Sequence, residues 1–300
     1  MSRVAVTGAR GFIGAAACER LRSDGHEVVE IDLPEVDVTD ARAVEQALQG
    51  CDGVIHTAAI VDEDGDMSEF VRVNVGGTRN VLDAAQRAGA DRVVHLASVA
   101  VWGYEFDHDL SEDAPPRTVG NPYIDTKAAS ELLALRRGAA VVRPGDVYGP
   151  RSQPWVVRPL QAFQSGMFVL PGKGEGIITP VYVDDLVDCV VRALDHPDAP
   201  GTAFTCWDGS PVTAWDFFQH HARWAGRKLR TAPLPLVAAA ARLGELTGRT
   251  DVHPASLQFI SRKAVYPNER ARRILGWEPK VTLDEGMRRV EEWLRSEALI

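Results

Sequence analysis

The sequence has no long apolar run. Its longest apolar stretch, residues 234–241, ends at Arg242, far short of the roughly 20 residues that a membrane-spanning helix needs. The opening residues, MSRVAVTGARGFIG, place glycines where a signal peptide requires an unbroken apolar segment. The sequence therefore predicts a cytoplasmic protein with no membrane partner.

Cysteine is scarce, and its spacing is uninformative. The four cysteines show no CxxC motif and have no histidine at zinc-ligand intervals; they are Cys18, Cys51, Cys189 and Cys206. We therefore expect neither a metal site nor a disulfide framework.

Positive charge is also in deficit. The chain has 33 Lys and Arg against 42 Asp and Glu, a formal net charge of -9 and a pI near 5.4. Such a chain is repelled by the phosphates of nucleic acids and by anionic lipid headgroups. The charge balance favours a small-molecule partner over nucleic acid.

The first half alternates β-branched runs with helical stretches, which is typical of βαβ units around a parallel sheet. The predicted strands are Val4–Thr7, Glu27–Asp32, Gly53–Thr57, Arg92–Ser98 and Ala139–Arg143. The predicted helices between them are Phe12–Ser23, Ala41–Gln49, Ser68–Ala88 and Pro122–Arg137. The pattern indicates an α/β fold with a doubly wound parallel sheet, the Rossmann arrangement.

The second half is less regular. Prolines interrupt shorter elements after residue 150, which indicates a smaller, irregular substrate-binding domain over 151–300 beside a cofactor-binding domain over 1–150. The segment at about 178–206 is expected to return to the first domain. Two helices of the second half are announced by capping boxes, Thr213 with Asp216 and Thr282 with Glu285.

A glycine-rich motif, TGARGFIG, follows the first predicted strand and opens the first helix. Gly8 permits a tight turn, and Gly11 and Gly14 allow the backbone to approach a ligand and the helix to approach the sheet. The N–H groups at the start of the helix, at Phe12, Ile13 and Gly14, would face a pyrophosphate together with the positive end of the helix dipole. The position of this loop predicts a dinucleotide site.

Asp32 ends the second predicted strand. A carboxylate there can accept hydrogen bonds from the hydroxyls of the adenosine ribose, and it repels a 2′-phosphate. No arginine follows immediately, since the next residues are Leu33 and Pro34. The sequence predicts NAD as the cofactor in preference to NADP.

Three residues form a candidate catalytic set. Tyr123 and Lys127 are four residues apart on a predicted helix, so an ammonium can lie near a phenol and favour the phenolate. Ser98 ends the fourth predicted strand, where ligands gather in doubly wound sheets. The same spacing occurs in surface pairs, and serine often caps a turn, but the combination favours catalysis.

The motifs together resemble the extended short-chain dehydrogenases/reductases of the NAD-dependent epimerase/dehydratase superfamily. The segments that carry the resemblance are TGARGFIG, HTAA, NVGGTRNVL, SVAVWG, YIDTK, RPGDVYGP and, more weakly, YVDDL. The resemblance implies catalytic roles for Ser98, Tyr123 and Lys127. It also implies that the following residues border NAD: Asp37 and Val38 at the adenine, Ala58 and Asn74 at the centre, Lys127 at the nicotinamide ribose, Pro144 and Val147 at the nicotinamide, and Tyr123 as a further cofactor contact.

Two activities are compatible with this family. Sugar-nucleotide enzymes would have an asparagine where Asp146 stands and an arginine shortly before YVDDL, but the sequence there is GIITPVYVDD. These departures favour an NAD-dependent oxidoreductase that interconverts a secondary alcohol and a ketone on a hydrophobic, steroid-like substrate, resembling the 3β-hydroxysteroid dehydrogenases. The alternative is a nucleotide-sugar 4-epimerase or dehydratase. By resemblance, we also expect a homodimer formed through the helices near 68–88 and 122–137.

Overall fold

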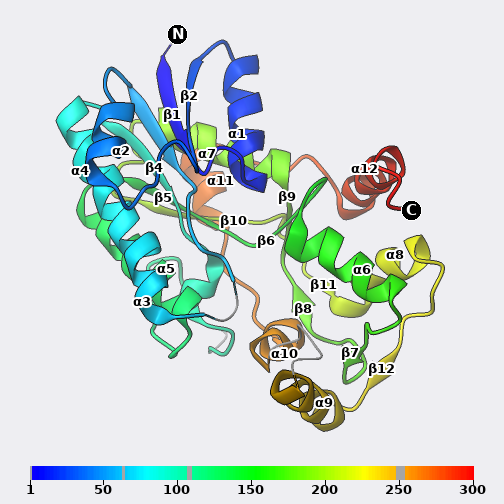
Figure 1. The fold of residues 1–300 in the computed structure, drawn as a ribbon. Coiled ribbons are helices and arrows are strands. Elements are labelled where there is room, and N and C mark those ends of the chain that lie inside the picture. The colour runs from blue at the N-terminus through cyan, green and yellow to red at the C-terminus, as the bar shows by residue number, and fades with distance from the viewer. Residues whose placement is uncertain (1, 63–64, 107–109, 248–253) are drawn as a thin grey trace.

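The computed structural model describes residues 2–62, 65–106, 110–247 and 254–300 (Figure 1). Its centre is a six-stranded parallel sheet in the order β10-β5-β4-β3-β1-β2. The strands are β1 (Arg3–Thr7), β2 (Glu27–Ile31), β3 (Gly53–His56), β4 (Arg92–Leu96), β5 (Ala140–Pro144) and β10 (Ala203–Cys206). The predicted doubly wound α/β fold is confirmed.

Helices cover both faces of this sheet, because successive strand residues point to opposite sides. On β1, Val4 and Val6 pack with α1 (Phe12–Ser23) and α7 (Val183–Asp195), whereas Ala5 packs with α2 (Ala41–Ala47) and α4 (Thr78–Ala88). Helix α5 (Pro122–Arg136) packs on the same side as α4, against β5. Parallel strands buried on both faces explain the nearly continuous apolar runs in the sequence.

The prediction of one continuous helix over 68–88 is wrong. The structure has a short α3 (Met67–Phe70), a π-helical segment over Val71–Gly77, and then α4. A Cβ at Gly77 would lie only 2.8 Å from Cγ2 of Val38, so glycine lets this segment approach the loop after β2. Such π-helical turns occur frequently at functional sites.

The remaining elements lie mainly beyond the carboxyl ends of the sheet strands. They are a 3-10 turn (Val99–Trp102), β6 (Asp146–Tyr148), a π-helical turn (Gln153–Val157), α6 (Arg158–Gln164), β7 (Leu170–Pro171), β8 (Ile177–Ile178), β9 (Pro180–Tyr182), β11 (Val212–Thr213), α8 (Ala214–Trp224), β12 (Thr231–Ala232), α9 (Leu234–Thr247), α10 (Pro254–Ser261), α11 (Glu269–Leu275) and α12 (Leu283–Ser296). Figure 1 shows α6, α8, α9 and α10 grouped away from the sheet, whereas β10 is an edge strand of the sheet and α7 packs against it.

Both predicted helix starts are confirmed, with Thr213 and Thr282 as the N-cap residues. The Asp216 amide donates to Oγ1 of Thr213 at 3.0 Å at the start of α8, and the Glu285 amide donates to Oγ1 of Thr282 at 3.3 Å at the start of α12. Side-chain capping satisfies amide groups that the first helical turn leaves unpaired.

All four cysteines are buried and free. Among the described residues, no cluster of three or more His, Cys, Asp or Glu side chains could bind a metal ion. In the same part of the chain, no helix is both long and apolar enough to cross a membrane.

Candidate active site

The glycine loop joins β1 to α1 with almost no free space. Gly8 has a φ of +69°, and a Cβ on it would lie 2.9 Å from the amide nitrogen of Ala58. A Cβ on Gly14 would lie 2.0 Å from the carbonyl oxygen of Gly8. Only glycine fits either position, so the backbone itself forms the surface beside the carboxyl end of β1.

The start of α1 is open to an anion. Gly11 is the N-cap residue and supplies no capping side chain, and the first turn contains no acidic residue. The N–H groups at Phe12 and Ile13 belong to this first turn, where helical amides have no partner within the helix and the dipole is positive. The loop therefore fits the pyrophosphate of a dinucleotide.

Asp32 lies directly after β2, beside the glycine loop. Its carboxylate accepts hydrogen bonds from the amides of Arg10, at 2.7 Å, and Leu33, at 2.8 Å. The Arg10 side chain reaches the same turn and pairs with Glu35 at 2.7 Å. Sequence reasoning does not single out this arginine, because it comes from the glycine loop rather than from the residues after Asp32.

We expect Asp32→Ala to weaken NAD binding by roughly 10- to 100-fold and to weaken NADP binding less, because a charged hydrogen bond to a ribose hydroxyl is worth about 1.5–3 kcal/mol. Titration of both cofactors against the wild type and the variant measures this. A wild-type preference for NADP would contradict the role given to Asp32.

The residues expected at the adenine lie in the loop after β2. The amide of Thr39 donates to the Asp37 carboxylate at 2.8 Å, and this bond holds the pKa of Asp37 below its ordinary value. Val38 is buried against the π-helical segment at Gly77. The structure therefore places both residues at the β2 side of the glycine loop.

The residues expected at the centre of the cofactor lie after β3. The Ala58 amide donates to Oγ1 of Thr7 at 3.3 Å. Asn74 accepts a bond from the Ile60 amide at 2.7 Å and donates to Oγ1 of Thr126, on α5, at 3.1 Å. Asn74 thus ties the loop after β3 to the helix that carries Tyr123 and Lys127.

Ser98 and Tyr123 are brought together by two local caps. Ser98 lies two residues beyond β4, and its Oγ accepts a bond from the Ala100 amide at 3.1 Å, which starts the 3-10 turn. Oδ1 of Asn121 caps α5 by accepting from the Ile124 amide at 3.0 Å, so Tyr123 lies in the first helical turn. The Ser98 side chain hydrogen-bonds the Tyr123 phenol.

The pKa of Tyr123 is raised from its ordinary value. Burial is the main cause, the hydrogen bond from Ser98 opposes it, and the nearby Asp146 carboxylate adds to it. A protonated phenol can donate to a ketone oxygen, and conversion to phenolate makes the same group a proton acceptor.

Lys127 is buried one turn further along α5, and its Nζ donates to the carbonyl oxygen of Leu96 at 2.5 Å. Burial lowers the pKa of this ammonium to about 8. In the described part of the chain, no hydrogen bond joins the ammonium to the Tyr123 phenol. The predicted pair therefore shares one helix face, and the ammonium is held by the Leu96 carbonyl.

Pro144 ends β5, and Val147 lies on β6 beside Asp146. Asp146 is buried; its carboxylate accepts from the Thr179 amide at 2.7 Å and forms an ion pair with Arg262. The sequence identifies Asp146 only as a departure from the sugar-nucleotide pattern and does not point to Arg262, which is 116 residues away.

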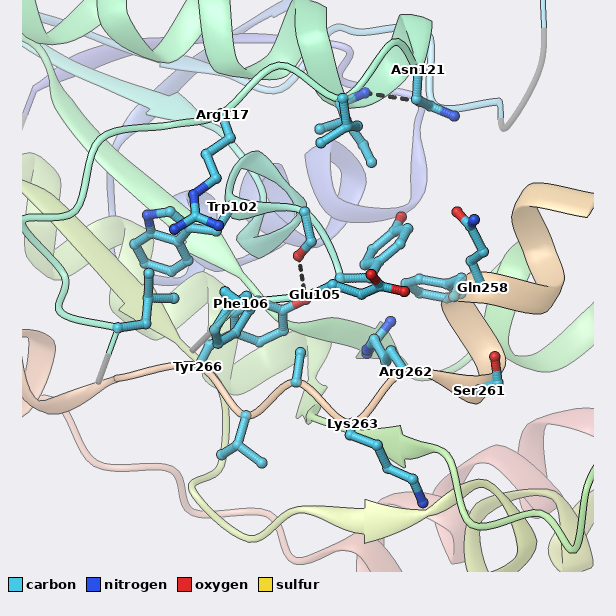
Figure 2. Close-up of a pocket in the computed structure, with 18 of the residues that line it drawn as sticks. Trp102, Glu105, Phe106, Arg117, Asn121, Gln258, Ser261, Arg262, Lys263 and Tyr266 are labelled. Carbon is cyan, nitrogen blue, oxygen red and sulfur yellow. Dashed lines mark hydrogen bonds between the residues drawn. The ribbon is translucent and has the colours of Figure 1, made fainter. Parts of the chain in front are cut away.

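A cavity of about 1360 Å³ opens beside Tyr123 (Figure 2). Aromatic and aliphatic residues form much of its wall, among them Trp102, Phe106, Leu110, Ile124, Phe259, Val265 and Tyr266. Polar groups include Arg117, Asn121, Gln258 and Arg262. No residue of the glycine loop lines this cavity, which is therefore a candidate substrate side, separate from the glycine loop and bordered by Tyr123.

Three buried histidines lie outside the catalytic set. His56 bonds Thr7 and Thr78 at 2.7 and 2.9 Å, and His95 bonds Ser130 at 3.2 Å. Nε2 of His221 bonds the carbonyl oxygen of Trp155 at 2.9 Å. Burial lowers the pKa of His56 and of His221 to about 3.

These shifts predict acid sensitivity. Below about pH 6.5 the unfolded chain binds a proton at His221 that the folded chain does not, so stability falls as the pH falls toward 3. We expect the unfolding free energy of the wild type, relative to His221→Phe, to drop by about 2 kcal/mol between pH 7.5 and 5.0. Urea unfolding of both proteins measures this, and a difference independent of pH would contradict it.

Comparison with known proteins adds three findings. A model of the NAD dependent epimerase/dehydratase family matches residues 4–206. The UDP-glucose 4-epimerase of Mycolicibacterium smegmatis is 31% identical over 99% of both chains, and a 3 beta-hydroxysteroid dehydrogenase/Delta 5-->4-isomerase of Mycobacterium tuberculosis is 28% identical over 96% of this chain and 89% of its own. The solved structure of MoeE5 with UDP-glucose and NAD has a TM-score of 0.80 and 26% identity, covering 99% of both chains.

Proposed function

Because the chain belongs to the NAD-dependent epimerase/dehydratase family, we propose that it interconverts a secondary alcohol and a ketone on a hydrophobic substrate of steroid-like size. The observation that carries this proposal is the cavity beside Tyr123, whose wall offers the apolar side chains of Phe106, Phe259 and Val265 among its polar groups. A pocket of this kind favours a substrate that gains binding energy from the burial of apolar surface.

Each member of the catalytic set has a distinct task in this proposal. Bound NAD supplies the hydride acceptor. Tyr123 takes the hydroxyl proton, and Ser98, which already hydrogen-bonds the phenol, holds the substrate oxygen. Lys127 places a buried positive charge on the same helix face and so favours the phenolate.

Relatives of two kinds support an alcohol or ketone substrate. The hydroxysteroid dehydrogenase of M. tuberculosis is one. The other is the 2-alkyl-3-oxoalkanoate reductase of Stenotrophomonas maltophilia, 27% identical over 96% of this chain and 98% of its own.

The alternative is a nucleotide-sugar epimerase. It is favoured by the 31% identity to the M. smegmatis UDP-glucose 4-epimerase and by Arg262 in the cavity wall. We rank it second because the Asp146 carboxylate pairs with this arginine and cancels its charge. The homodimer and the cytoplasmic location stay predictions.

The size of the preferred substrate tests the proposal. A polycyclic secondary alcohol should have a kcat/KM at least tenfold above that of cyclohexanol, since burying roughly 60 Å² more apolar surface contributes about 1.5 kcal/mol. Steady-state assays with NAD measure both alcohols. Equal values, or UDP-glucose epimerised faster than any alcohol is oxidised, would overturn the proposal.

A further inference from the structure

Arg262 lines the cavity beside Tyr123 and forms an ion pair with Asp146. The Arg262 side chain has 0% exposure and the Asp146 side chain 3%, so water does not screen their attraction. Arg262 follows α10, whereas Asp146 begins β6. The Asp146 carboxylate also accepts from the Thr179 amide at 2.7 Å, which holds it in place.

Arg262 keeps donors that the protein does not use. Nη2 bonds Asp146, but Nε and Nη1 are buried and have no hydrogen-bond partner among the described residues. The guanidinium lies over the ring of Phe259 at 4.1 Å and that of Tyr104 at 5.8 Å. Buried N–H groups without an acceptor are costly and rare, which indicates that a ligand supplies the acceptor.

Arg262 is also placed to meet a ligand. It lines the same cavity as Tyr123, and Figure 2 shows it among the residues of that wall. Phe259 and Tyr104, which cover the guanidinium, line this cavity too. Because the Arg262 side chain has no exposed surface, the inference requires one of these rings to move aside when a ligand binds.

We propose that Arg262 anchors a second oxygen of the substrate while the reacting carbon lies at Tyr123, and that Asp146 is the positioning residue that sets the net charge of this anchor. The inference rests on the proposed alcohol–ketone activity and names its substrate class: a hydrophobic alcohol or ketone with a further oxygen close by.

The ion pair determines what kind of oxygen is preferred. Asp146 cancels the charge of Arg262, so the remaining N–H groups favour a neutral acceptor, such as an ester or ketone carbonyl, over a carboxylate. Asparagine at position 146 could still accept from the Thr179 amide, but it would leave the arginine with an uncompensated positive charge. An oxyanion would then be preferred.

Three matched probes test the inference: methyl 3-hydroxydecanoate, 3-hydroxydecanoate and 3-decanol. The wild type should oxidise the ester with a kcat/KM roughly 10- to 100-fold above that of 3-decanol, because a hydrogen bond from a charged donor contributes an effect of this size. The kcat/KM for the ester should also exceed that for the acid. Asp146→Asn should shift the acid-to-ester ratio at least about tenfold toward the acid. Asp146→Asn/Arg262→Met, which leaves no unpaired carboxylate, should remove the advantage of the ester over 3-decanol.

A loss of folding cannot mimic these results, because ratios between probes are compared within one protein. An unchanged acid-to-ester ratio in Asp146→Asn would contradict the inference. So would a wild type that oxidises polycyclic alcohols but none of the three probes, and this outcome would leave the proposed function intact. A wild type inactive toward every alcohol would overturn the proposed function and the inference together.

Discussion

We expect Tyr123→Phe to lower kcat for alcohol oxidation by about 10²- to 10⁴-fold, the usual contribution of a positioned proton acceptor. The substitution removes the hydroxyl that bonds Ser98 but keeps the ring that lines the cavity. NAD affinity should therefore change by less than about threefold. Steady-state kinetics and NAD titration of the same preparation separate the two effects.

Tyr266→Phe is a matched control. Tyr266 lines the same cavity, and its hydroxyl donates to the carbonyl oxygen of Gly103 at 3.3 Å rather than to Ser98. Its loss should leave kcat within about threefold of the wild type. Full activity in Tyr123→Phe, or an equal loss in both variants, would contradict the role of Tyr123.

Gly14→Ala should weaken NAD binding by roughly 10- to 100-fold and destabilise the fold by about 1–3 kcal/mol, the usual cost of overpacking. The new Cβ would lie 2.0 Å from the Gly8 carbonyl oxygen, and that atom is backbone and cannot rotate away. Helix α1 must then move from the loop, which displaces the amides expected to hold the pyrophosphate. NAD titration and urea unfolding measure the two effects.

Gly76→Ala serves as the comparison for Gly14→Ala. A Cβ on Gly76 would approach no closer than 3.7 Å to the Val71 carbonyl oxygen, an ordinary contact. This variant should bind NAD like the wild type. A Gly14→Ala protein that binds NAD with unchanged affinity would show that the glycine loop is not the pyrophosphate site.

The sequence predicted the sheet well because its signals are local. Five strands follow from β-branched runs, and α1 begins at Phe12 and ends at Ser23 as expected, because the glycine motif precedes it. The proximity of Ser98 and Tyr123 was also predictable. Ser98 follows β4 at the edge where the parallel strands end, and α5, which connects β4 to β5 and carries Tyr123, begins from that edge. The interruption of the helix over 68–88 was not predictable, because the π-helical segment packs closely through Gly77 against Val38, a contact between distant parts of the chain.

The substrate side was beyond sequence reasoning for a different reason. Arg262 stands in a segment without a motif, and only the folded chain brings it to Asp146. A buried carboxylate requires a partner. Burial of Asp146 therefore implies a cationic partner, but the sequence does not identify which of its many arginines forms this ion pair.

Net production of NADH tests the central claim most directly. An alcohol dehydrogenase accumulates absorbance at 340 nm beyond one equivalent per enzyme, because hydride leaves with released NADH. An epimerase returns the hydride to its substrate in each cycle and accumulates none. With excess NAD and a polycyclic secondary alcohol, our account predicts many equivalents of NADH from the wild type and almost none from Tyr123→Phe. Conversion of UDP-glucose to UDP-galactose with no net NADH, and no NADH from any alcohol, would contradict it.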